Sequence, residues 1–393
     1  VLIDNQKYGL DGAVIPVATA LSKFTNTANV TVTNASNVTA FQVKNGAELT
    51  NSGNLDISHG TGIEVSGIGS SIKAGAMAGA ITVRDGKAGI YVHGGATLAT
   101  SDTITVNGSA AGIWVGADSG AVTINPTAHI TALGASYGNL IINQATAGTT
   151  LVNGAILEMA GSGAALLTSN NLNSASFGTV LVSSNTGGKG IALANVDGST
   201  SSGDLTLGTN WAISVTGNGS GVYANTTGNL TVNSSNISLT GSGNAIKTDT
   251  VNTLTIGSNA NIATMNAAAV LITGNPSNLL NAGHITAANI AATAILLDAN
   301  AQTFTNQTGG VISGIVNLGG GADLAQLENG SSLSTLQMGL GADTVSLKNG
   351  AIFTLIDGGI EAGVNDTLLF DATTYNLDAS SPAKMINFEW ANV

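Results

Sequence analysis

The sequence predicts an all-β protein, a right-handed parallel β-helix whose coils each carry three short strands. Three observations predict this fold. A small residue followed by an apolar–any–apolar triplet recurs about every 25 residues, two further triplets follow within each repeat, and Gly, Asn and Ser fill the gaps. Alternation with a period of two turns one face of each strand toward the core, and Gly-, Asn- and Ser-rich gaps make turns. Three strands and three corners therefore close each coil into a triangular prism.

The first triplet can be followed through most of the chain. Its copies, each written with the small residue that precedes the triplet, are 62–65, 89–92, 112–115, 190–193, 221–224, 245–248, 269–272 and 294–297, with looser copies that begin at Ala40, Asn139 and Ala165. Successive copies between 62 and 294 lie 23 to 31 residues apart. We expect Gly or Ala at the head of the triplet because only a small residue fits where the chain turns tightly into the strand.

The second and third triplets are clearest in the middle of the chain. Leu230-Thr231-Val232 and Ile237-Ser238-Leu239 follow one copy of the first triplet. A single coil of about 25 residues would not fold alone, because ordering its backbone costs more free energy than its few small apolar side chains return. Stacked coils share one core and form hydrogen bonds on both sides of every strand.

The alternative fold is an antiparallel β-sandwich or barrel with similar short strands. That fold has no reason to keep a fixed step near 25 residues. We therefore expect residues 1–317 to form β-helix coils, with an N-terminal cap near residues 1–30. Residues 318–393 form the last coils of the same helix and contain Gly- and Asp-rich turns.

Composition excludes several classes of protein. The formal net charge is −12, from 10 Lys and Arg against 22 Asp and Glu, and no basic cluster offers phosphate groups a binding surface, so nucleic acid is not an expected partner. Without cysteine there is neither a disulfide framework nor a thiolate metal site. No apolar run reaches the roughly 20 residues that span a bilayer. The chain starts without a signal-peptide pattern, and we expect that any such segment is not part of this sequence.

The last coils contain the segments Gly341-Ala342-Asp343-Thr344-Val345, Asn365-Asp366-Thr367-Leu368 and Asn387-Phe388-Glu389. With the repeat and the composition, these segments resemble the passenger domains of bacterial autotransporters of the pertactin-like type. The resemblance implies export through the periplasm and the outer membrane, and display on the bacterial cell surface or secretion. It also implies a role in adhesion, aggregation or host interaction. The family's membrane β-barrel is not expected within this chain, which looks like a passenger fragment, and the lack of cysteine suits passage through a pore.

Two sequences look like catalytic motifs. Gly134-Ala135-Ser136-Tyr137-Gly138 matches the nucleophile elbow, but no helix pattern follows it. Asp118-Ser119-Gly120 resembles the motif of serine protease autotransporters, but the four His residues (59, 93, 129 and 284) fall on different coils. We interpret both motifs as corners, and we expect no catalytic and no cofactor-binding residue.

The Gly-rich turns that contain Asp323, Asp343 and Asp366 are similar to calcium-binding nonapeptide repeats. Their aspartates lie 20 and 23 residues apart instead of nine, which leaves one motif per coil. Calcium takes six to eight oxygen ligands, so we interpret these aspartates as caps of backbone N–H groups and expect no metal site.

The middle residue of the first triplet should point outward from each coil. These residues are Glu64, Tyr91, Trp114, Ile141, Leu167, Ala192, Tyr223, Lys247, Leu271 and Leu296. No acidic pair recurs at the coil spacing, so the list offers no site for cleaving polysaccharides. Tyr91, Trp114, Ile141 and Leu167 would instead form an outward apolar ladder, a candidate partner-binding face. The alternative is packing between rungs that only stiffens the sheet.

These observations favour a secreted or surface-displayed, non-enzymatic protein of adhesin type. Its expected partners are proteins or glycans of a host-cell or bacterial surface, and self-association is an option. Two alternatives stay open: a carbohydrate-active β-helix enzyme, and a structural stalk for a functional head that lies outside this sequence.

Overall fold

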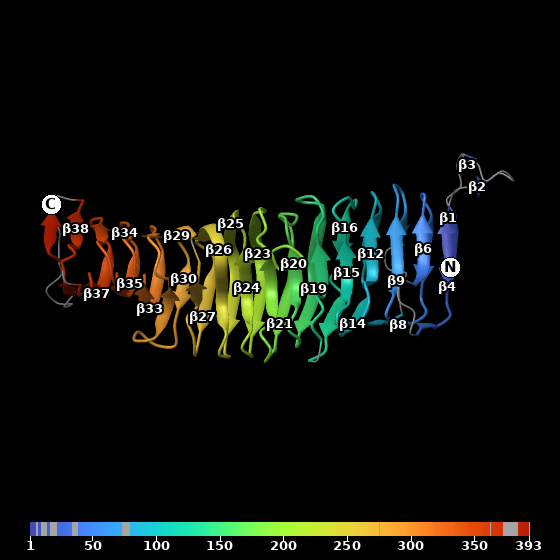
Figure 1. The fold of residues 1–393 in the computed structure, drawn as a ribbon, viewed down its shortest axis with the longest axis horizontal. Coiled ribbons are helices and arrows are strands. Elements are labelled where there is room, and N and C mark those ends of the chain that lie inside the picture. Colours follow the sequence, from blue (N-terminus) through green and yellow to red (C-terminus); the bar gives the residue numbers. More distant parts are fainter. Residues whose placement is uncertain are drawn as a thin grey trace. The chain divides into compact units, whose positions relative to one another are not determined.

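A computed structural model describes residues 1–4, 7–8, 14–15, 22–33, 38–72, 79–134, 136–274, 276–361, 363–371 and 384–392. All regular structure in these residues is β-strand, with no helix. The chain divides into two compact units, Val1–Ala192 and Leu193–Val393, which are described separately. In each unit successive strands pair in parallel with the coils before and after, so the predicted parallel β-helix is confirmed (Figure 1).

The first unit consists of three stacks of parallel strands. The first stack is β1 (Leu2–Asp4), β6 (Thr39–Lys44), β9 (Thr61–Ser66), β12 (Ala88–His93), β15 (Ala111–Val115), β18 (Ile141–Asn143) and β20 (Ala164–Thr168). The second stack is β4 (Lys23–Asn26), β7 (Glu48–Asn51), β10 (Ser71–Ile72), β13 (Thr97–Thr100), β16 (Val122–Ile124) and the first half of β19 (Thr150–Met159). The third stack is β5 (Val30–Val32), β8 (Leu55–Ser58), β11 (Ile81–Arg84), β14 (Thr103–Asn107), β17 (His129–Ala132), the second half of β19 and β21 (Phe177–Val182).

The second unit has the same three-stack organisation. The first stack is β24 (Ser220–Asn225), the start of β26 (Asn244–Ile256), β28 (Val270–Ile272), β31 (Thr293–Leu296), the ends of β33 (Val311–Asn317), β35 (Ser332–Gln337) and β37 (Ile352–Asp357), and β39 (Lys384–Ile386). The second stack is the starts of β23 (Leu205–Val215) and β25 (Asn229–Leu239), the end of β26, β29 (Pro276–Asn281), β32 (Thr303–Asn306), β34 (Leu324–Leu327), β36 (Thr344–Leu347), β38 (Thr367–Phe370) and β40 (Trp390–Asn392). The third stack is the ends of β23 and β25, β27 (Asn261–Thr264), β30 (His284–Thr286) and the starts of β33, β35 and β37.

Two elements stand apart from these stacks. The hairpin β2 (Lys7–Tyr8) and β3 (Val14–Ile15) is antiparallel and falls in the predicted cap region. Strand β1 also falls there, but it already pairs in parallel with β6. Strand β22 (Lys189–Leu193) contains the division between the units, and the predicted boundary at residue 318 lies within the second unit.

The core of each unit is built from the inward residues of the strands. In β12, Ile90 and Val92 are fully buried, and Ile90 pairs with Ile63 in one neighbouring coil and Ile113 in the other. Side chains of the same type therefore stack along the core, as in the row Ile63, Ile90 and Ile113. Two fully buried aromatic rings, Phe41 in the first unit and Phe304 in the second, take the place of aliphatic side chains in such rows, since they pair with Ile63 and with Leu279 and Ala325.

The small residue before the first strand is required by the neighbouring coil. A Cβ atom built on Gly62 or Gly112 would lie 2.5 Å from the carbonyl oxygen of Gly89 or 2.6 Å from that of Leu140, each in the next coil. The prediction of a small residue is correct, but its main cause is this approach of two backbones and not a tight turn.

Buried asparagines close one corner in both units. Asn26 donates from Nδ2 to Oδ1 of Asn51 at 2.6 Å, and Asn281 donates in the same way to Asn306 at 2.9 Å. Each side chain also bonds to backbone groups of its own corner; Asn281, for example, bonds to both the N–H and the carbonyl of Gly283. These amides satisfy backbone groups that no strand partner reaches.

We predict that Asn281→Ala lowers the free energy of unfolding by about 2–3 kcal/mol, because it leaves buried backbone and amide groups without partners. The control is Asn252→Ala, which removes an exposed bond between Asn252 Nδ2 and Asn229 Oδ1 of 3.0 Å and should cost less than about 0.5 kcal/mol. Chemical unfolding of the whole chain measures both. Equal effects of the two substitutions would contradict a structural role for the buried asparagine pair.

Candidate functional site

The outward row of the first stack in the first unit follows a register that the structure defines. Glu64 pairs with Tyr91, Tyr91 with Trp114, Trp114 with Ile142, and Ile142 with Leu167. The predicted neighbourhood of Tyr91 and Trp114 is confirmed: their ring centroids are 6.0 Å apart in an edge-to-face arrangement.

The placement of Ile141 in this row was wrong. Ile141 pairs with Ile113 and Leu166 and is fully buried in the core, and Ile142 is the outward residue. The step from Ile113 to Ile141 is one residue longer than the sequence pattern suggested, and a slip of one residue exchanges the two faces of a strand. Leu167 does lie in the outward row, but it and Ile142 are only 8% and 4% exposed, so the row does not continue past Trp114 as an open apolar ladder.

Tyr91 is packed by polar neighbours as well as by Trp114. The His93 ring stacks on it with centroids 4.4 Å apart, and the Lys87 ammonium lies 3.3 Å from the centroid of the Tyr91 ring and 5.4 Å from that of Trp114. Trp114 Nε1 donates to Gln144 Oε1 at 2.8 Å. The aromatic pair therefore holds the Lys87 ammonium in place by cation–π attraction.

A cleft of about 560 Å³ opens beside Tyr91 on the outer surface of the first unit. It lies where the third stack turns into the first, at the corners before β9, β12 and β15. Its lining residues are Thr39, His59, Gly60, Thr61, Glu64, Asp85, Gly86, Lys87, Tyr91 and Ser109. Of the four residues predicted to form a binding face, Tyr91 is the one that lines this cleft. The cleft is within the size range of small-molecule sites, and most of the residues that line it carry polar side chains.

The backbone at these corners is in an unusual conformation. The residues that follow the paired Ser58, Arg84 and Asn107 are His59, Asp85 and Gly108, and all three have positive φ, at 62°, 30° and 89°. Gly takes this conformation without penalty, whereas other residues lose roughly 1–2 kcal/mol each. The chain nevertheless places His and Asp at two of these three corners, and both side chains line the cleft. Strain of this kind at consecutive coils marks a candidate functional site.

The cleft carboxylates are held in defined positions. Asp85 Oδ1 accepts from the Ser109 backbone N–H at 3.0 Å and from its hydroxyl at 3.3 Å. Gly108 leaves room for this contact, because a Cβ there would lie 2.1 Å from Asp85 Oδ1. Glu64 accepts from Gln42 Nε2 at 3.0 Å, and its other oxygen lies 3.0 Å from His93 Nε2. Partial burial alone would raise the pKa of Glu64, but the contacts with His93 and Gln42 and the nearby Lys44 charge outweigh it and lower the pKa.

The cleft also lies in the part of the chain with the least negative charge. Residues 1–100 contain six Lys and Arg and six Asp and Glu, whereas residues 101–393 contain four against sixteen. The sequence pattern did not single out His59, Asp85 and Lys87 as site residues, because they lie at corners, where the strand periodicity does not apply. The dipeptides His59-Gly60 and Asp85-Gly86, each just before a first strand, were the available signal.

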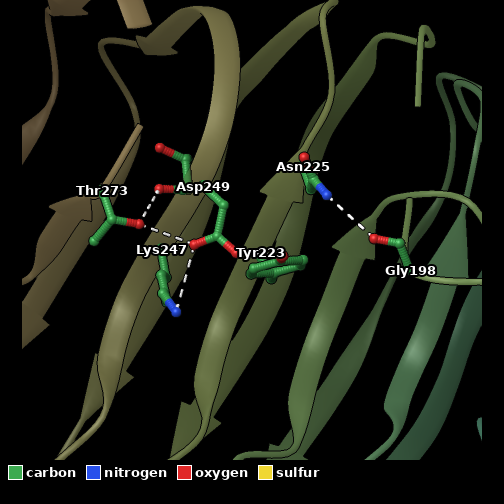
Figure 2. A network of polar contacts seen from close by, with 7 residues as sticks. Gly198, Tyr223, Asn225, Lys247, Asp249 and Thr273 are labelled. Carbon is green, nitrogen blue, oxygen red and sulfur yellow. Dashed lines mark hydrogen bonds and ion pairs between the residues drawn. The ribbon is translucent and has the colours of Figure 1, made fainter. Parts of the chain in front are cut away.

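In the outward row of the first stack of the second unit, the charged side chains contact one another (Figure 2). There Tyr223 donates to Asp249 Oδ2 at 2.6 Å, Thr273 donates to Asp249 Oδ1 at 2.9 Å, and Lys247 Nζ lies 3.5 Å from the same oxygen. Burial and the Asp249 carboxylate raise the pKa of Tyr223. In this row the lysine has an internal carboxylate partner, and the network ties adjacent coils together.

The catalytic-looking motifs lie at corners, as expected. Ser136 Oγ donates to the Gly108 carbonyl at 2.9 Å, and Ala135 of the same motif lies outside the described residues. The buried Ser119 Oγ has no hydrogen-bond partner among the residues described, so no described histidine or carboxylate activates it.

The Gly-Asp turns form a ladder of buried carboxylates in the second unit. Asp323, Asp343 and Asp366 each accept, through Oδ1, from the backbone N–H of Gln302, Asp323 and Asp343, respectively, at 2.8, 2.8 and 2.9 Å. Glu389 extends the ladder by accepting from the Asp366 N–H at 2.8 Å. Burial, reinforced by the neighbouring carboxylates, raises the pKa of Asp323 to about 7 and that of Asp343 to about 6. The predicted capping of backbone N–H groups is thus present, with each cap on the preceding coil.

Comparison with protein families, curated proteins and solved structures finds no match for this chain. Within the described ranges there is no helix long and apolar enough to cross a lipid bilayer. The same residues contain no group of three or more His, Asp or Glu side chains arranged to hold a metal ion. The site is therefore interpreted from its own geometry.

We predict that the carboxylate ladder makes stability depend on pH. Because the folded-state pKa values are raised, the contribution of these groups is complete below about pH 4 and is lost as the pH rises through about 6 to 7. The double variant Asp323→Asn, Asp343→Asn should therefore gain roughly 1–3 kcal/mol relative to the unmodified chain between pH 5 and pH 8.

Chemical unfolding at the two pH values measures this difference. Asp204→Asn, at an exposed aspartate, is the control and should show no such gain. If the difference in free energy of unfolding between the double variant and the unmodified chain is the same at both pH values, ionisation of Asp323 and Asp343 does not destabilise the fold.

Proposed function

We propose that this chain is the passenger domain of a bacterial autotransporter, displayed on the cell surface or released from it, and that it acts as a non-enzymatic adhesin. In this proposal the solenoid is a scaffold, and the cleft of the first unit contacts a component of a host-cell or bacterial surface. The observation that carries the proposal is the cleft itself. It combines an ammonium held against aromatic rings, two hydrogen-bonded carboxylates and two corner residues with positive φ. The passenger-like segments of the last coils and the parallel β-helix support the proposed route of export.

A carbohydrate-active enzyme is the second candidate, because Glu64 and Asp85 line the same cleft. Glycoside hydrolysis needs one carboxyl group that stays protonated near neutral pH. Glu64 is unsuited to that role, because its pKa is lowered and its oxygens are already bonded to Gln42 and His93. Asp85 is likewise bonded to Ser109. The arrangement suits carboxylates that hold a ligand better than carboxylates that transfer a proton to it.

We predict that Tyr91→Ala weakens binding of the fluorescently labelled chain to intact cells by on the order of 2 kcal/mol, since removal of the ring releases the Lys87 ammonium. The control is Tyr223→Ala, which removes the aromatic ring from the outward row of the second unit and should leave cell binding unchanged. Binding isotherms at matched protein concentration, with melting temperatures for each variant, provide the measurement.

The outcomes separate the candidate functions. If Trp114→Ala lowers stability and leaves binding intact, the Tyr91–Trp114 pair is structural and the adhesive surface lies elsewhere. Absence of cell binding by the unmodified chain would favour a stalk whose functional head lies outside this sequence. Release of shortened sugars from surface polysaccharide during incubation would favour the enzyme.

A further inference from the structure

We propose that the cleft of the first unit binds an anionic sugar residue, and that Lys87 Nζ pairs with the carboxylate of that sugar. This inference rests on the proposed function and specifies its ligand. Three observations support it: Lys87 has no carboxylate partner among the described residues, the surrounding coils carry little net charge, and both hydrogen-bond donors and acceptors line the cleft wall.

Lys87 differs from several other cations of the chain. Lys23, Arg84, Lys247 and Lys348 each have a carboxylate within ion-pair distance. No carboxylate of the described residues lies within 4.0 Å of Lys87 Nζ, although Asp85 and Glu64 line the same cleft. The ammonium instead rests on the faces of Tyr91 and Trp114. Lys87 is exposed, so its ammonium is accessible to an external anion.

The charge distribution favours an anion at this place and limits its charge. Residues 101–393 carry sixteen acidic side chains against four basic ones, so an anionic ligand is repelled over most of the chain and least repelled at the N-terminal coils. Within the cleft, Glu64 and Asp85 flank the ammonium. A multiply charged phosphate or sulfate would be repelled by these carboxylates more strongly than a single carboxylate surrounded by neutral hydroxyls.

The remaining wall suits sugar hydroxyl groups. Thr39 and Thr61 offer hydroxyls that both donate and accept, and Ser109 offers an acceptor oxygen because its hydroxyl already donates to Asp85. His59 offers an imidazole, and Asp85 offers the oxygen that Ser109 leaves free. These groups come from several consecutive coils, so they line an elongated cleft that follows the stacking direction. The Tyr91 ring is already in contact with Lys87 and His93, and its role is therefore to position the ammonium and not to stack on the sugar.

The test uses the whole chain and two pairs of soluble probes. Calorimetric titration compares a glucuronate-containing trisaccharide and sialyllactose, each beside its carboxyl-reduced counterpart. We expect at least one acidic probe to bind at least tenfold more tightly than its reduced form. Lys87→Gln should reduce that affinity at least tenfold, whereas Lys23→Gln, at an exposed lysine of the second stack, should not change it.

His59→Gly provides a second variant that is expected to fold. Glycine accepts the positive φ of this corner, so the melting temperature of the variant should stay within about 5 °C of that of the unmodified chain. Its affinity for the acidic probe should fall several-fold. Unchanged affinity in both Lys87→Gln and His59→Gly would overturn the assignment of the cleft.

Three further results would overturn the inference. These are no binding of either acidic probe, equal affinity for the acidic and reduced forms, and complete displacement by inorganic phosphate at concentrations near the Kd of the sugar, which would identify a general anion site. If the chain still binds cells in any of these cases, the proposed adhesive function stands and only its ligand class fails. Absence of cell binding by the unmodified chain would instead refute the proposed adhesive function.

Discussion

Everything in this protein depends on the close parallel stacking of one coil on the next. A strand inside a stack, such as β9, is hydrogen-bonded on both sides. The backbones approach so closely at the start of this strand that a Cβ on Gly62 would lie 2.5 Å from the next coil's carbonyl oxygen. Because the interior is repeated, it tolerates little variation. The residues that differ in chemistry from coil to coil are the outward residues and the corner residues. The candidate site consists of residues of these two kinds.

The fold could be predicted because its signal is repeated many times. Alternation within β12 and a small residue before it recur in coil after coil, so an error in one coil does not change the conclusion. The error at Ile141 arose where that signal disappears: Leu140, Ile141 and Ile142 form a continuous apolar run, and all three are buried. A run without alternation does not reveal which residue faces the core, and only the register with the neighbouring coils defines it.

The site was harder to predict for a different physical reason. Tyr91 and Trp114 belong to strands, so their neighbourhood follows from periodicity. His59, Asp85 and Lys87 belong to corners, where no period applies and position depends on backbone torsions. What brings these side chains together is the positive φ at His59 and Asp85, a property that Gly would supply at less cost. Non-glycine residues at corners where glycine is favoured are therefore a useful place to search for function in solenoid sequences.

The carboxylate ladder of the second unit gives the stack a direction. Each acidic side chain belongs to a later coil, and the N–H group that it accepts from belongs to the coil before it, from Gln302 through Asp323 and Asp343 to Asp366. Removal of the last coil of the ladder would expose a backbone N–H at the new edge, whereas removal of its first coil would expose a carboxylate, and water can bond to either group. The two edges of the ladder are thus chemically different, because one presents a hydrogen-bond donor and the other an acceptor.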